Sequence, residues 1–101
     1  VEAARHLGAR MMREGGTSTR SKLDMGFRLV TGRKPKDSER SILTDALSRR
    51  RALYTRDTDA ANKLLSVGLS KRDPALNVVD YAAWTAVARL MINLSEALTK
   101  G

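Results

Sequence analysis

The sequence predicts an all-α fold, a compact bundle of four to five helices around a largely buried C-terminal helix. Apolar residues recur every three or four positions along most of the 101 residues, and no strand-like alternation persists. Glycine, proline and capping residues divide this pattern into five segments. Hydrophobic residues make up 42% of the chain and charged residues 30%, which is typical of a globular domain rather than a disordered segment.

The first helix is expected from about Glu2 to Glu14 and ends at Gly15-Gly16, which supply the positive φ that a helix C-terminus needs. Its apolar stripe comprises Ala4, Leu7, Gly8 and Met11. The second helix follows the hydroxyl residues 17–19, which offer N-cap acceptors, and it stops at Gly32. Its apolar face comprises Leu23, Phe27 and Val30.

The turn GRKPK (residues 32–36) leads into a third helix with Asp37 or Ser38 as its N-cap. Asp37 and Glu39 favour the positive end of the helix dipole. The expected buried face comprises Ile42, Leu43, Ala46, Leu47, Leu53 and Tyr54. A short fourth helix is expected from a Thr58 cap to Gly68. Its buried residues are Ala61, Leu64 and Leu65.

The segment LSKRDPALN (residues 69–77) has no periodicity, and Pro74 disfavours helix at Asp73. Asn77 is the expected N-cap of the final helix, with Asp80 reaching back in a variant capping box. The helix is apolar around most of its circumference, so other helices should surround it. Charges within it argue against a membrane span. Its polar seam comprises Thr85, Arg89, Asn93, Glu96 and Lys100.

The net charge of +8 comes entirely from residues 1–56, which hold 14 Lys and Arg against 6 Asp and Glu. This asymmetry fits either an acidic protein surface or a polyanion partner. The basic set comprises Arg20, Lys22, Arg28, Arg33, Lys34, Lys36 and Arg49 to Arg51. The helices flanking GRKPK permit a helix-turn-helix hypothesis, in which Arg40, Thr44 and Arg49 face base edges. The turn is longer than usual for that motif, and only Tyr54 lies near enough for base stacking.

The residue types present favour no catalytic, cofactor or metal site. The chain has no cysteine, and His6 is its only histidine, so neither a thiolate metal site nor a His-based triad can be assembled. The acidic residues are scattered, and Gly15-Gly16 lacks the flanking motif of a phosphate loop. We therefore expect no enzymatic activity from this chain. The residues expected to contact a partner are Arg33, Lys34, Lys36, Arg49, Arg50, Arg89, Asn93 and Glu96.

Two stretches, FRLVTGRKPKDSE and GLSKRDPALNVVDYAAWTAVARLMINLSEALTK, resemble the C-terminal end of the domain of unknown function 1553, a family of large proteins from planctomycetes and related bacteria. Its members commonly end in RDP-x-L, AAWT and LLNLDEFLT patterns. The matching positions are Arg72, Asp73, Pro74, Leu76, Ala82 to Thr85, Asn93, Leu94 and Glu96. Ser95 and Ala97 depart from the pattern. The resemblance implies an exported, periplasmic or cell-surface protein that often carries an N-terminal cytochrome-c-like domain, and it implies no reaction.

We accordingly expect residues 1–101 to form one helical domain, the C-terminal module of a longer chain. The first functional hypothesis is a non-catalytic module that packs on upstream domains of the same polypeptide or on an acidic protein surface. The second is a small basic domain that binds nucleic acid or another polyanion. The third is a module that walls the cleft of an enzyme whose catalytic residues lie elsewhere.

Overall fold

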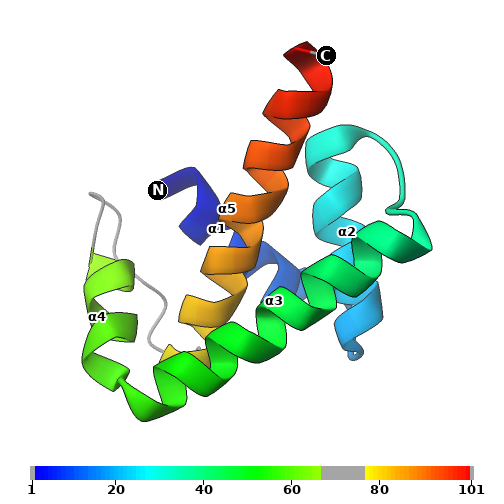
Figure 1. Ribbon diagram of the computed structural model, residues 1–101. Coiled ribbons are helices and arrows are strands. Elements are labelled where there is room, and N and C mark those ends of the chain that lie inside the picture. The colour runs from blue at the N-terminus through cyan, green and yellow to red at the C-terminus, as the bar shows by residue number, and fades with distance from the viewer. Residues whose placement is uncertain (1, 67–76, 101) are drawn as a thin grey trace.

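A computed structural model describes residues 2–66 and 77–100. Within those ranges it contains helices and no strand, which confirms the predicted all-α fold (Figure 1). The helices are α1 (Glu2–Glu14), α2 (Thr19–Thr31), α3 (Asp37–Arg56), α4 (Thr58–Ser66) and α5 (Val78–Lys100). The predicted helix end at Gly68, the effect of Pro74 and the RDP-x-L motif lie outside the described residues.

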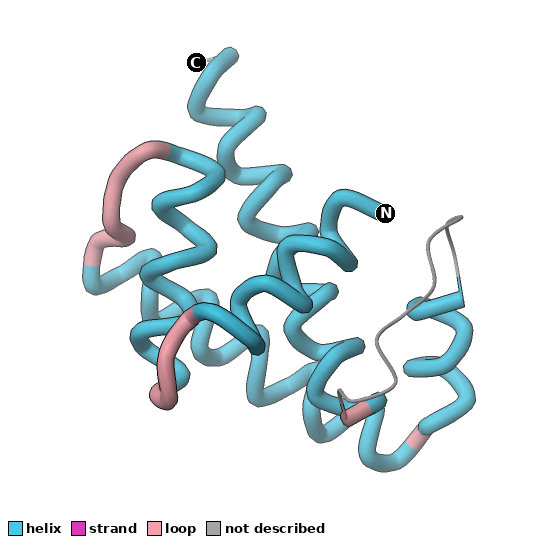
Figure 2. Tube along the Cα trace, turned by 180° about the vertical axis from the view of Figure 1, so that it is seen from behind, coloured by secondary structure: helices cyan, strands magenta, loops and turns pink. Residues whose placement is uncertain are grey.

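Helix α5 occupies the centre of the bundle and contacts α1, α2, α3 and α4. The long helix α3 crosses it, and α2 and α4 lie on opposite sides of α5 (Figures 1 and 2). Trp84 is only 1% exposed, and Ala82, Ala83 and Ala88 allow close approach of neighbouring helices. The prediction that other helices surround α5 is therefore confirmed. None of the described helices is long and apolar enough to cross a membrane.

The helix ends agree with the predictions at four positions and differ at three. Helix α1 ends at Glu14, and Gly16 has the expected positive φ of 88°. Gly32 ends α2 with a φ of 83°. Ser18 accepts a hydrogen bond from the Ser21 amide, and Asn77 caps α5 through the amide of residue 80.

Two caps and the expected capping box differ from prediction. The backbone puts the N-cap of α3 at Lys36, before both expected residues, Asp37 and Ser38. The side chain of Asp57, rather than Thr58, accepts a hydrogen bond from the Ala60 amide at the start of α4. Asp80 closes no capping box and instead accepts a hydrogen bond from Arg51 Nε (3.1 Å). Only the difference at Asp80 depends on a residue distant in sequence, since the cap of α4 is made within three residues.

Two residues predicted to be buried on α3 are exposed: Ile42 by 61% and Leu53 by 37%. Helix α3 packs through a narrow stripe, of which Leu43 and Leu47 are the fully buried members. Ile42 is adjacent to that stripe in sequence but about 100° away around the helix. The predicted face was too wide because α3 lies at the edge of the bundle.

Thr85 corrects the prediction of a continuous polar seam on α5. Its side chain is only 1% exposed, whereas Arg89, Asn93 and Glu96 are exposed. Helix α1 covers Thr85 at Gly8, where an added Cβ would lie 2.9 Å from the Thr85 amide nitrogen. The absence of a side chain at Gly8 lets the two helices approach closely enough to bury the threonine.

Candidate functional site

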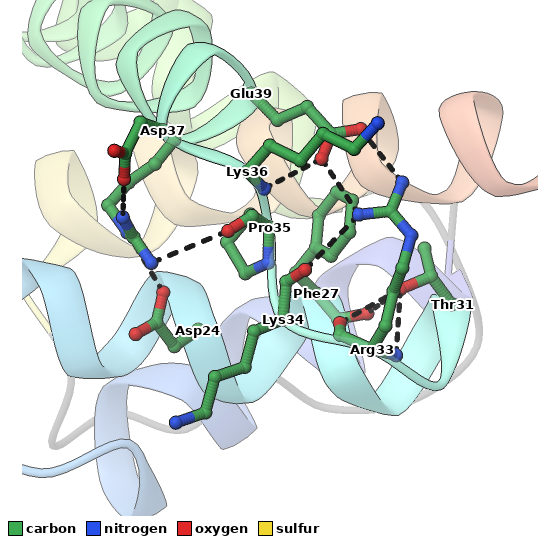
Figure 3. A network of polar contacts seen from close by, with 10 residues as sticks. Asp24, Phe27, Thr31, Arg33, Lys34, Pro35, Lys36, Asp37 and Glu39 are labelled. Carbon is green, nitrogen blue, oxygen red and sulfur yellow. Dashed lines mark hydrogen bonds and ion pairs between the residues drawn. The ribbon is translucent and has the colours of Figure 1, made fainter.

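The turn between α2 and α3 is held by a bidentate ion pair between Arg33 and Glu39, with N–O distances of 2.8 and 3.0 Å (Figure 3). Glu39 Oε1 also accepts a hydrogen bond from the backbone N–H of Lys36 (2.8 Å). The Arg33 guanidinium lies over the buried ring of Phe27, 5.2 Å from its centroid. Arg33, predicted to contact a partner, therefore bridges the turn and the core of its own chain.

Arg40 forms the second half of this network. Its Nε donates to Asp24 of α2 (3.1 Å), and its Nη1 donates to Asp37 (2.9 Å). The Arg40 side chain is only 16% exposed. Arg40 Nη2 also donates to the carbonyl oxygen of the buried Pro35 (3.5 Å), a residue labelled in Figure 3. Arg40 therefore points into the α2–α3 junction and does not form the exposed row with Thr44 and Arg49 that the helix-turn-helix hypothesis requires.

The ion pair with Arg33 and the backbone hydrogen bond from Lys36 lower the pKa of Glu39 from 4.5 to about 2. Since the folded-state pKa lies below the unfolded value, the pair stabilises the fold fully above about pH 4.5. That contribution is lost as the pH falls towards 2. We expect Glu39→Gln to lower the urea midpoint at neutral pH, and the difference from wild type to shrink steadily between pH 4.5 and 2.

Urea unfolding followed by circular dichroism at several pH values measures this difference. Asp45→Asn, which removes an exposed i,i+4 pair with Arg49, is a suitable control because that pair is 79% and 60% exposed on its two sides. A difference for Glu39→Gln that stays constant down to pH 2 would contradict the assignment.

The remaining residues predicted to contact a partner lie apart. Lys34 and Lys36 are exposed on the turn, and Arg49 pairs with Asp45 at 2.9 Å. Asn93 and Glu96 are exposed on α5. In the part of the chain that the structure describes, no hydrogen bond links Arg89, Asn93 and Glu96. Arg50 and Arg89 are brought together, because both line one small cavity between α3 and α5.

A surface feature that the sequence analysis missed lies on the outer side of α2. Here Met25 and Leu29 line an open hollow of about 470 Å³, and Leu29 is 49% exposed. Arg28 and Lys34 border the same hollow, as do Ser21 and the Arg40-bound Asp24. The i,i+4 spacing of Met25 and Leu29, on a different side of the helix from Leu23 and Phe27, was the signal in the sequence.

Comparisons of the chain with protein-family models, curated proteins and solved structures gave no match. The chain is therefore described by its fold and surface alone: it is a basic, all-α bundle with an apolar hollow next to exposed cations.

Proposed function

We propose that this chain is a non-catalytic helical module that assembles with an acidic protein surface on other domains of a longer, exported polypeptide. The observation that carries the proposal is the apolar hollow on α2. Leu29 leaves about half of its surface in solvent there, next to Arg28 and Lys34. An exposed apolar patch with a charged rim is typical of a protein–protein interface.

The charges around the hollow favour an acidic partner. Arg28 and Lys34 form no ion pair with any described residue, whereas Asp24 is neutralised by Arg40. The net charge of the side chains around the hollow is therefore positive. Complementary carboxylates on the partner would fix its orientation and accelerate association.

The resemblance to the domain of unknown function 1553 supports the rest of the proposal. It implies that the chain is the terminal module of a longer exported protein, in which upstream domains are the nearest partners. The nucleic-acid alternative receives less support, because Arg33, Arg40, Arg49 and Arg51 are all paired with carboxylates of their own chain. Phosphate contacts would have to compete with those pairs.

The test measures binding of this chain to the separately produced upstream segment of its parent polypeptide by titration calorimetry. We expect Leu29→Ser, or Arg28→Glu combined with Lys34→Glu, to weaken binding at least about tenfold, which corresponds to about 1.4 kcal/mol. Lys63→Glu on α4 is the matched control, because it reverses an exposed charge on the opposite side of α5 and should leave the affinity within about twofold.

Equal weakening by Lys63→Glu, or no effect of the α2 substitutions, would contradict the proposed surface. A parallel titration with duplex DNA tests the alternative function. Duplex affinity that persists at about 150 mM salt and falls steeply at higher salt would favour nucleic-acid binding.

A further inference from the structure

A second surface feature, separate from the hollow on α2, is a small cavity between α1, α3, α4 and α5. Its volume is about 140 Å³, and its polar lining consists of Arg50 and Tyr54 of α3 and Thr85 and Arg89 of α5. Each pair is spaced i,i+4, so both of its side chains lie on the same side of their helix. Alanine and leucine side chains from α1, α4 and α5 form the apolar remainder.

The cavity carries two positive charges and no negative one. No Asp or Glu is among its described lining residues. Arg50 and Arg89 form no ion pair within residues 2–66 and 77–100. The nearby arginines of the same run differ, since Arg49 pairs with Asp45 and Arg51 with Asp80. Two cationic side chains that line one cavity repel each other, and an anion bound there would reduce that repulsion.

Thr85 also lines the cavity, but α1 covers it at Gly8 and its hydroxyl is closed to solvent. In the described helices Thr31, Thr44 and Thr55 each donate to the carbonyl four residues earlier, as helical threonines commonly do. Thr85 makes no such bond: it is 1% exposed, and its Oγ1 has no hydrogen-bond partner among the described residues. Buried hydroxyls without a partner are rare, and the close contact with α1 at Gly8 is what buries this one.

Tyr54 adds a fourth polar group. The residue is 5% exposed, and its hydroxyl forms no hydrogen bond with the described part of the chain. The cavity lining therefore holds two arginines and a tyrosine hydroxyl that are able to donate, with no side-chain acceptor other than the hydroxyls of Tyr54 and the covered Thr85. This composition selects an anion that has several acceptor oxygens.

We propose that this cavity binds a phosphate group. A tetrahedral oxyanion offers four oxygens to the two arginines and the Tyr54 hydroxyl, whereas a carboxylate has only two oxygens for these three donor groups. Arginine also matches the geometry of phosphate with paired N–H groups. The 140 Å³ volume is well below the roughly 300 Å³ of the smallest usual ligand pockets, so it suits the phosphate group itself and excludes a buried nucleotide.

The test titrates inorganic phosphate into the ¹⁵N-labelled chain at constant ionic strength and follows amide shifts by NMR. We expect saturable shifts at Tyr54 and Thr85. Arg50→Gln and Arg89→Gln should each weaken the fitted affinity at least about tenfold. Arg20→Gln is the matched control, because it removes one exposed charge from α2, away from the cavity, and should change the affinity less than about twofold.

The Tyr54 hydroxyl is tested by Tyr54→Phe, which keeps the ring and removes the oxygen, and Thr85→Val is the control at a covered hydroxyl. Tyr54→Phe should weaken phosphate binding several-fold and Thr85→Val should not, with unchanged circular dichroism spectra showing that the fold is retained. A parallel titration with O-phosphoserine separates the two sources of phosphate: saturable shifts at the same amides assign the site to a phosphorylated side chain, and shifts with inorganic phosphate alone assign it to the free ion.

Three results would overturn the proposal. The first is a phosphate response no larger than that to sodium chloride. The second is acetate binding as tightly as phosphate. The third is phosphate affinity that Arg20→Gln lowers as much as Arg89→Gln does. The proposal does not depend on the docking surface, since Leu29→Ser should leave phosphate binding unchanged.

Discussion

Replacing Trp84 by alanine is expected to lower the free energy of unfolding by about 3–5 kcal/mol. Trp84 is 1% exposed on the central helix, so its truncation removes the largest fully buried side chain and leaves a cavity at the crossing of several helices. Two cations cover the ring as well: Lys22 Nζ lies 5.9 Å from the centroid and the Arg51 guanidinium 6.0 Å. Because domains of this size are stable by about 5–15 kcal/mol, the loss is a large fraction of the total.

Denaturant unfolding followed by far-ultraviolet circular dichroism measures this loss, since Trp84 is the only tryptophan and its fluorescence disappears with the substitution. Trp84→Phe should cost clearly less, because most of the apolar volume remains. Leu29→Ala is the control for an apolar truncation at the surface and should cost less than about 1 kcal/mol. A Trp84→Ala variant within 1 kcal/mol of wild type would contradict the central position assigned to this side chain.

Most of the fold could be predicted from the sequence, because its signals are local. Gly32 stops α2 through its own backbone conformation, and Ser18 and Asn77 cap the helices that directly follow them. The apolar circumference of α5 identified the central helix, since no other arrangement buries a helix on nearly all sides. These inferences need only residues close in sequence and the 3.6-residue period of the α-helix.

The polar interactions of the basic half could not be predicted in the same way. Arg33 and Glu39 are six residues apart across a turn, and Arg51 reaches Asp80 on another helix. The sequence does not show which arginines have a carboxylate close by, because these pairs form only when the chain folds. Among the exposed cations without such partners, Arg28 and Lys34 lie at the α2 hollow and Arg50 and Arg89 at the α3–α5 cavity.

The buried residues that the sequence missed share a cause, which is close contact between helices. Thr85 is buried because Gly8 allows α1 to lie directly on it. Arg5 is 2% exposed, and its Nη1 donates to the Leu65 carbonyl at the end of α4 (2.7 Å). The sequence pattern placed Thr85 on a polar seam and gave no indication that Arg5 is buried. Only the packing of α1 against its neighbours places them inside.

Replacing Gly8 by alanine is expected to lower the free energy of unfolding by about 1–3 kcal/mol. At an exposed helical position the same change would stabilise the chain by up to about 1 kcal/mol, because alanine is the better helix former. Here the new Cβ would lie 2.9 Å from the amide nitrogen and 3.1 Å from the Cα of Thr85. These are backbone atoms of the central helix, so relief requires α1 to move away from α5. Thermal and urea unfolding of the purified variant measure the change.

Gly26→Ala provides the matched comparison, because it adds the same methyl group to another buried glycine. The neighbours of Gly26 are the side chains of Met11 and Met91, which can change rotamer. We therefore expect a smaller loss at Gly26 than at Gly8. Adding Thr85→Ala to Gly8→Ala should not restore stability, since the closest clash is with the backbone. A Gly8→Ala variant as stable as wild type, or one rescued by Thr85→Ala, would show that α1 and α5 do not pack through their backbones at this point.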